Sequence, residues 1–233
     1  MPEEFSKDLL NNTVSARDQL DSDQYVCFTR VEQPAKRVLF IGNSTARHGV
    51  APHLGWLHDW GMAASDISKD YVHVTADLLA ERFGPISFCI AQCAVWEREY
   101  WSTAVLEEHY KKARDFGADI IIARLGGNAD REKFGEHDFS EGFADMIRFF
   151  DPAGRAQIIV ADMFWESPKI DGLIRKACDD NGWEFVHIGD LGAMDEMKAI
   201  GQFEHPGVAA HPGDKGMATM ARRFFDAVCR LNP

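Results

Sequence analysis

Short apolar runs alternate with amphipathic stretches along the chain. Five of these runs are rich in Ile, Val and Phe and are apolar on both parities, which is typical of parallel strands covered on both faces. They are RVLFIG (37–42), ISFCIA (86–91), DIIIARL (119–125), AQIIVADM (156–163) and WEFVHI (183–188). The pattern therefore predicts five buried strands.

The segments between the runs carry apolar residues at helical spacing. The two clearest stripes are Phe139, Phe143, Met146, Ile147 and Phe150, and Met217, Met220, Phe224, Val228 and Leu231. Strands that alternate with helices imply right-handed crossovers. We expect a three-layer α/β/α sandwich around a flavodoxin-like, doubly wound parallel sheet of five strands in the order 2-1-3-4-5.

The length of 233 residues suits one α/β domain. Residues 1–36, with loosely spaced leucines and a closing Pro34, suggest an N-terminal helical arm, and residues 37–233 suggest the domain itself. Two connections, 44–69 and 189–211, are longer than this architecture needs. Long ordered loops are usually functional, so we expect ligand contacts there.

Composition and charge exclude several classes of function. A net charge of -12 argues against nucleic-acid binding, and no apolar run approaches the ~20 residues of a membrane helix. The polar, acidic N-terminus is unlike a secretory signal, so we expect a cytoplasmic protein with a small-molecule substrate. Five scattered cysteines fit reduced core thiols, and neither they nor His48, His53 and His58 form a metal-ligand pattern. We expect no metal and no cofactor, and the oligomeric state stays open.

Three separate segments offer candidate chemistry. Ser44 follows the first strand, where a hydroxyl would lie at the carboxyl edge of the sheet, although a helix cap is an equal alternative. Asn128 follows Gly126-Gly127 after the third strand and offers an uncharged amide donor for an oxyanion, or simply occupies a glycine-rich turn. His211 precedes the last helix and can present a ring nitrogen.

Taken together and in this order, the three segments resemble the SGNH/GDSL hydrolase family. Gly42-Asn43-Ser44 stands for the Gly-Asp-Ser block, Gly126-Gly127-Asn128 for the Gly-x-Asn-Asp block, and HPGDKGM from His211 for the histidine block. The resemblance covers residues 37–231. It implies an esterase in which Ser44 is the nucleophile, His211 the base, and the Asn128 amide with the Ser44 backbone N–H the oxyanion donors.

Two positions depart from the family pattern. Val208 stands where an aspartate usually lies three residues before the histidine, which leaves either Glu204 as the acid or a backbone carbonyl that orients a Ser-His dyad. The family's glycine after the second strand is also missing. The backbone N–H of Ala94 is the candidate replacement as an oxyanion donor.

The resemblance further implies acyl transfer through a covalent intermediate, with a short acyl group on a carbohydrate as the preferred substrate. The candidate substrate contacts are Asn43, Gly127, Trp56, Trp60 and Trp96. Simple packing is an equal alternative for the tryptophans of the first long loop. The neighbouring Glu97 and Arg98 suggest a local structural tie.

Two other functions remain open. The turn GNSTARHG after the first strand is a plausible phosphate- or flavin-binding loop, although it lacks GxGxxG and the P-loop lysine. A noncatalytic carbohydrate-binding module on the same fold is the second. A conventional α/β-hydrolase is excluded because its serine follows several strands, whereas Ser44 follows the first predicted one.

Overall fold

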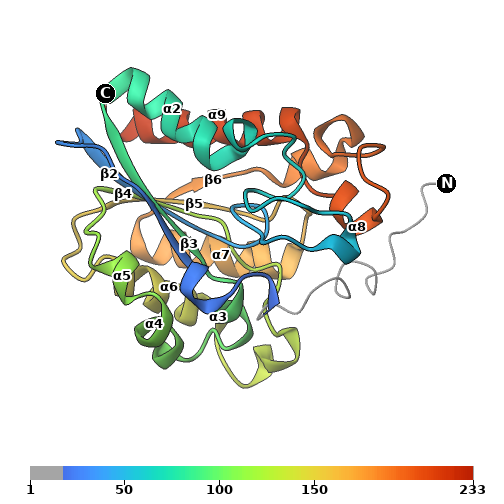
Figure 1. The fold of residues 1–233 in the computed structure, drawn as a ribbon. Helices are drawn as coiled ribbons and strands as arrows, with labels where there is room; N and C mark the ends of the chain where they lie inside the picture. Colours follow the sequence, from blue (N-terminus) through green and yellow to red (C-terminus); the bar gives the residue numbers. More distant parts are fainter. Residues whose placement is uncertain (1–17, 233) are drawn as a thin grey trace.

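The computed structural model describes residues 18–232, which build one central sheet between two layers of helices (Figure 1). The strands are β1 (Val26–Thr29), β2 (Lys36–Gly42), β3 (Ile86–Gln92), β4 (Ile120–Ala123), β5 (Gln157–Ala161) and β6 (Glu184–Val186). Their order is β1-β3-β2-β4-β5-β6. Strands β2 to β6 are the five predicted strands, they are parallel, and they lie in the predicted order.

The sixth strand was not expected. Strand β1 pairs antiparallel with β3 at the edge of the sheet, with Val26 opposite Ala91 and Thr29 opposite Phe88. The prediction of a helical arm is therefore wrong for residues 26–29, where β-branched and aromatic residues suit an edge strand. Strand β1 covers the backbone groups that β3 would otherwise expose. The remainder of the predicted arm, residues 1–17, lies outside the described residues.

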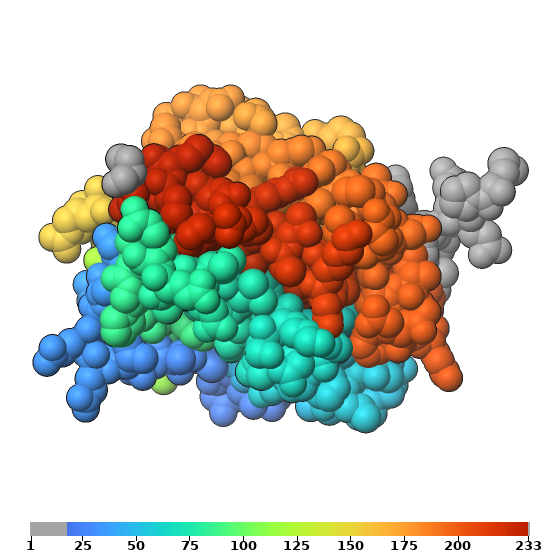
Figure 2. Space-filling model, turned by 90° about the horizontal axis from the view of Figure 1, so that it is seen from above, coloured from blue at the N-terminus to red at the C-terminus, as the bar shows by residue number. Residues whose placement is uncertain are grey.

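Helices cover both faces of the sheet. The α-helices are α2 (Tyr71–Phe83), α3 (Ala94–Arg98), α4 (Thr103–His109), α5 (Lys111–Arg114), α6 (Phe139–Phe150), α7 (Pro168–Asn181), α8 (Pro206–Ala209) and α9 (Asp214–Leu231). Helices α2 and α9 pack side by side on one face (Figure 2). Helices α3 to α7 lie on the other face (Figure 1).

The predicted apolar stripes form the contacts between the layers. The stripe of α6 is buried along its whole length, and that of α9 is buried except for Leu231 at the end of the helix, which is 40% exposed. Side chains also fix where helices begin. Asp70 and Asp138 cap α2 and α6 by accepting hydrogen bonds from backbone N–H groups of their first turns.

Short 3₁₀ helices interrupt the connections. They are η2 (Ser22–Gln24), η3 (Pro52–Leu54), η4 (Ile67–Lys69), η5 (Arg131–Gly135), η6 (Gly189–Ala193) and η7 (Asp195–Met197). Within residues 18–232, no helix has the length and apolar character to cross a membrane, and no cluster of three or more His, Cys, Asp or Glu side chains is arranged to hold a metal ion. The five cysteines are free thiols.

Candidate active site

A tight turn presents Ser44 at the carboxyl edge of the sheet. Strand β2 ends at Gly42, and the backbone N–H groups of Ala46 and Arg47 then donate to the carbonyl of Asn43 at 2.8 and 3.0 Å. A Cβ at Gly42 would lie 2.5 Å from the Cβ of Ala46, so the turn requires glycine there. Because no helix of the described chain begins at Ser44, the helix-cap alternative does not apply.

His211 reaches Ser44 from the other end of the chain. Its Nε2 lies 3.0 Å from the Oγ of Ser44, although the two residues are 167 positions apart. Its Nδ1 lies 2.7 Å from the carbonyl oxygen of Gly207. A carbonyl only accepts hydrogen bonds, so Nδ1 carries the proton and Nε2 offers its lone pair to the serine hydroxyl. The pair has the geometry and tautomer of a nucleophile with its general base.

A backbone carbonyl therefore orients the imidazole. Gly207 lies in α8, one turn before His211, and its carbonyl occupies the position that a carboxylate would take beside Nδ1. The side chain of Glu204 is exposed, and no hydrogen bond or ion pair joins it to His211 in the described chain. Val208 is buried in a cluster with Trp56. Of the two alternatives left open by the sequence, this arrangement corresponds to the dyad.

The environment of His211 keeps its imidazole neutral. Burial lowers the pKa of His211 from 6.5 to about 3, the hydrogen bond to Gly207 opposes this shift, and the cationic forms of His48 and Arg124 add to it. The rings of Trp165 and His211 pack in a T-shaped arrangement, with their centroids 5.0 Å apart. A neutral histidine can accept the serine proton without first losing one of its own.

Asn128 lies in a turn that is tied to a buried carboxylate. Its Nδ2 donates to Oε2 of Glu97 at 2.6 Å, and its backbone N–H donates to Oε1 at 3.2 Å. Arg98 donates to the carbonyl of Asn128 at 3.2 Å. Glu97 and Arg98 thus each hold this turn, whereas no hydrogen bond or ion pair within residues 18–232 joins the two side chains as the sequence had suggested. One N–H of the Asn128 amide remains for a ligand.

Glu97 belongs to the candidate site, although the sequence suggested for it only a local structural tie. Its side chain is fully buried and also accepts hydrogen bonds from the backbone N–H of Gly126 at 2.6 Å and from Nδ2 of Asn43 at 3.2 Å. Burial raises the pKa of Glu97, and the hydrogen bonds from Asn128, Gly126 and Asn43 oppose that rise. Its position just after the second predicted strand was the available signal.

Arg124 is a second residue that the sequence analysis missed. It directly follows β4, is 1% exposed, and donates through Nη1 to Oδ1 of Asn43 and to Oγ1 of Thr45, which flank the serine. Burial lowers the pKa of Arg124, while Tyr71 and Glu97 raise it. Its Nε and Nη2 have no acceptor within residues 18–232. An arginine inside an otherwise apolar run was the signal that could have identified it.

Several predicted contacts do not reach the candidate site. The backbone N–H of Ala94 is already engaged, because it donates to Oε1 of Gln92 at 3.2 Å. Trp96 is 1% exposed and packs against Phe139 and Phe143 of α6. Neither the predicted oxyanion role of Ala94 nor the substrate contact of Trp96 fits this placement, because both groups are enclosed by the chain.

The first long loop is likewise packed. Trp56 is fully buried, which favours the packing alternative over a substrate contact. Trp60 is half-buried and stacks on His58, with centroids 4.1 Å apart. The side chain of Asn43 is buried between the charged groups of Glu97 and Arg124. Gly127 is half-buried and lies beside the side-chain amide of Asn43. Of these predicted contacts, Trp60 and Gly127 retain exposed surface.

The backbone N–H of Ser44 completes the candidate oxyanion donors. It has no hydrogen-bond acceptor within the part of the chain that the structure describes. The second N–H of the Asn128 amide is the other donor, since the first points to Glu97. A backbone amide and a side-chain amide are the kinds of donor that stabilise the negative charge of a tetrahedral intermediate.

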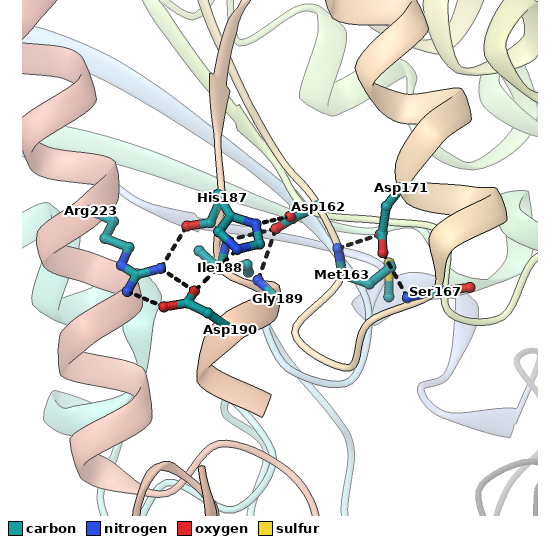
Figure 3. Close-up of polar contacts among 9 residues, drawn as sticks. All are labelled: Asp162, Met163, Ser167, Asp171, His187, Ile188, Gly189, Asp190 and Arg223. Carbon is teal, nitrogen blue, oxygen red and sulfur yellow. Dashed lines mark hydrogen bonds and ion pairs between the residues drawn. The ribbon is translucent and has the colours of Figure 1, made fainter. Parts of the chain in front are cut away.

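Asp162 anchors the segment that carries the histidine (Figure 3). It follows β5 and accepts hydrogen bonds from the backbone N–H groups of Ile188 and Gly189 at 2.6 and 3.1 Å, and it also contacts Nδ1 of His187. These contacts fix the chain where it leaves β6. The segment 189–211 therefore starts from a fixed point at the carboxyl edge.

Two further carboxylates extend this network (Figure 3). Arg223 of α9 pairs with Asp190, with Nη2 and Oδ2 2.8 Å apart, and so lowers the pKa of Asp190. Asp171 of α7 accepts from the backbone N–H groups of Met163 and Ser167 at 3.0 and 2.6 Å. Asp190 thus forms a structural ion pair with Arg223 after β6, and Asp171 holds the loop after β5.

Comparison with solved structures shows that the chain has the fold of the SGNH hydrolases, as the sequence resemblance implied. No protein-family model matches the sequence, and no curated protein matches it significantly.

Two of the similar structures show how far the likeness extends. One, from Parabacteroides merdae ATCC 43184, is named for its likeness to GDSL lipases; it has a TM-score of 0.57 at 16% identity, over 84% of this chain and 96% of that one. The other is a two-domain esterase active on acetylated mannans, with a TM-score of 0.54 at 14% identity, over 84% of this chain and 49% of that one. Identities this low establish the fold alone.

Proposed function

We propose that this protein is a serine esterase that hydrolyses short-chain, acetyl-like carboxylic esters, with an acylated carbohydrate as the preferred substrate class. One observation carries the proposal: the Ser44 hydroxyl lies 3.0 Å from a His211 nitrogen whose tautomer leaves it free to accept a proton. A hydroxyl that only packs needs no such partner. The similar esterase that acts on acetylated mannans supports the choice of substrate class.

In the proposed reaction, Nε2 of His211 removes the Ser44 proton as Oγ forms a bond to the ester carbonyl carbon. The backbone N–H of Ser44 and the free N–H of the Asn128 amide bind the oxyanion. His211 then returns the proton to the alcohol oxygen as the C–O bond breaks, which leaves an acyl-serine. Water, deprotonated by the same imidazole, attacks the carbonyl carbon of this ester, and the imidazolium returns the proton to Oγ of Ser44 as the acyl C–O bond breaks and the acid leaves. The Gly207 carbonyl holds the imidazolium that forms in each half-reaction.

The alternative functions receive less support. A phosphate-cradling turn offers several successive backbone N–H groups, whereas in this turn those of Ala46 and Arg47 already donate to the carbonyl of Asn43 and only N–H groups nearer Ser44 remain. A noncatalytic carbohydrate-binding module has no need for a base in the reactive tautomer beside a serine. The esterase proposal accounts for both features.

The test is hydrolysis of p-nitrophenyl acetate by the wild type and by the Ser44→Ala and His211→Ala variants, together with labelling by a fluorophosphonate. We expect both variants to fall to the background rate, and mass spectrometry to find the phosphonyl group on Ser44. Ser102→Ala is the matched control, since Ser102 precedes α4 without a side-chain capping bond. Wild-type turnover that survives Ser44→Ala would refute the proposal.

A further inference from the structure

Buried polar groups around the turn that carries Ser44 form one connected network, which contains the carboxylate of Glu97. Glu97 contacts Asn128, Gly126 and Asn43, and Asn43 in turn contacts Arg124. The network therefore joins the candidate oxyanion donor to the turn that carries the serine. The proposed chemistry uses neither Glu97 nor Arg124 directly, so their burial requires a separate explanation.

Every contact of the Glu97 carboxylate is with a donor. Oε1 accepts from the backbone N–H of Gly126 at 2.6 Å and from that of Asn128 at 3.2 Å, and Oε2 accepts from Nδ2 of Asn128 at 2.6 Å. Nδ2 of Asn43 lies 3.2 Å from Oε2. An ionised carboxylate only accepts, so the charged form fits these four donors. A protonated form would turn an O–H toward an N–H.

Asn43 lies between opposite charges and needs both ends of its amide. Its Nδ2 faces Glu97, and its Oδ1 accepts from Nη1 of Arg124 at 3.0 Å. An aspartate at this position, as in the usual Gly-Asp-Ser block, would satisfy Arg124 but would face the carboxylate of Glu97 at about this distance. Two buried like charges that close are strongly unfavourable. The asparagine of this chain is therefore matched to a carboxylate at position 97.

The same logic applies to the oxyanion donor. The side-chain amide of Asn128 can present either oxygen or nitrogen toward Glu97, and only nitrogen can donate to a carboxylate. The direction of the second N–H follows from that choice, because it is attached to the same nitrogen. A carboxylate at position 97 thus determines that the Asn128 amide keeps a second N–H donor for a ligand.

We propose that Glu97 is a positioning residue for the oxyanion site, which fixes the orientation of the Asn128 amide and accepts from Nδ2 of Asn43, whose Oδ1 in turn accepts from Arg124. The inference rests on the proposed esterase function and deepens it. A positioning role can be told apart from a purely structural one. It predicts a pair of substitutions that together restore stability but do not restore turnover.

The decisive variant is Asn43→Asp combined with Glu97→Gln. It moves the negative charge from position 97 to position 43, so that the new carboxylate can accept from both Arg124 and the newly introduced amide. The oxygen of that amide still accepts from the backbone N–H groups of Gly126 and Asn128. Its nitrogen, however, takes the place of Oε2 and turns the Asn128 amide over. We therefore expect folding to recover but catalysis to remain impaired.

The experiment measures urea unfolding and p-nitrophenyl acetate kinetics for the wild type, Asn43→Asp, Glu97→Gln, the double variant, and Glu136→Gln, which removes an exposed carboxylate as a control. We expect Asn43→Asp to be less stable than the double variant. Glu97→Gln and the double variant should each lose about 10²-fold in kcat, the lower range for one oxyanion donor, with KM changed less than about threefold. If Asn43→Asp does not fold, the double variant carries the test alone.

The outcomes separate this inference from the proposed function. A double variant with kcat within about threefold of the wild type would overturn the positioning role, as would a Glu97→Gln variant with unchanged kcat. An inactive wild type, or one whose activity survives Ser44→Ala, would overturn the esterase proposal and the role of Glu97 with it. A stable double variant with low kcat and near-normal KM supports the inference.

Discussion

As the pH is lowered below 6.5, the proposed activity of this protein should persist while its free energy of unfolding decreases. Burial lowers the pKa of His211 to about 3 in the folded chain, compared with 6.5 when the imidazole is exposed to water. The base therefore remains neutral, and able to act, at pH values where an ordinary histidine is protonated. Since kcat/KM reports the ionisation of the free enzyme, its acid limb should lie well below pH 6.5.

The same shift destabilises the fold in acid. Below pH 6.5 the unfolded chain binds a proton at His211 and the folded chain does not, so this group lowers stability as the pH falls and has no such effect above that pH. At about 1.4 kcal/mol per pH unit, the loss from this residue is about 2 kcal/mol at pH 5. Burial also lowers the pKa of His48, which adds a loss of the same sign.

The assay compares urea unfolding at pH 7 and pH 5 for the wild type and His211→Gln, with His137→Gln as a control, alongside kcat/KM of the wild type over the same range. The drop in stability should be about 2 kcal/mol smaller for His211→Gln than for the wild type. A kcat/KM profile that falls with a midpoint near 6.5, with an equal loss of stability in both proteins, would refute the reasoning.

Three substitutions test the site and the core. Asn128→Ala should lower kcat about 10²- to 10³-fold with little change in KM, as measured with p-nitrophenyl acetate; an unchanged kcat would exclude its amide as an oxyanion donor. Glu204→Gln should leave kcat/KM within about twofold, because Gly207 orients His211; a loss of 10³-fold would mean that the carboxylate acts after all. Trp56→Ala should cost about 3–5 kcal/mol in urea unfolding, whereas a loss of substrate affinity at normal stability would favour the sequence-based substrate contact.

The five parallel strands were predictable because each is apolar on both parities, from RVLFIG to WEFVHI, and this signal is local. Strand β1 was not predictable in this way. Three of its four residues are half-buried and Thr29 is exposed, and they form a strand because the edge of β3 is available to them. An edge strand of this kind depends on a partner that is distant in sequence.

In the candidate site, too, residues with a local sequence signal were predictable and residues defined by distant partners were not. Ser44 and His211 were identified because strand ends meet at one edge, and a motif marks each of them. Glu97 and Arg124 were not, because a buried charge is explained by its partners, and these come from three different segments. Trp56 and Trp96 show the converse, since an aromatic side chain in a loop or after a strand is equally compatible with packing and with ligand contact.

The contact between His211 and the Gly207 carbonyl makes one part of the proposed catalytic apparatus independent of residue identity. Every amino acid has a carbonyl, so no single base change can delete this acceptor as it could delete an aspartate. What evolution must preserve instead is the single turn of α8, with His205 accepting from its first N–H groups and Pro206 at its start. The side chain at the position that supplies the acceptor can therefore change while the imidazole stays oriented.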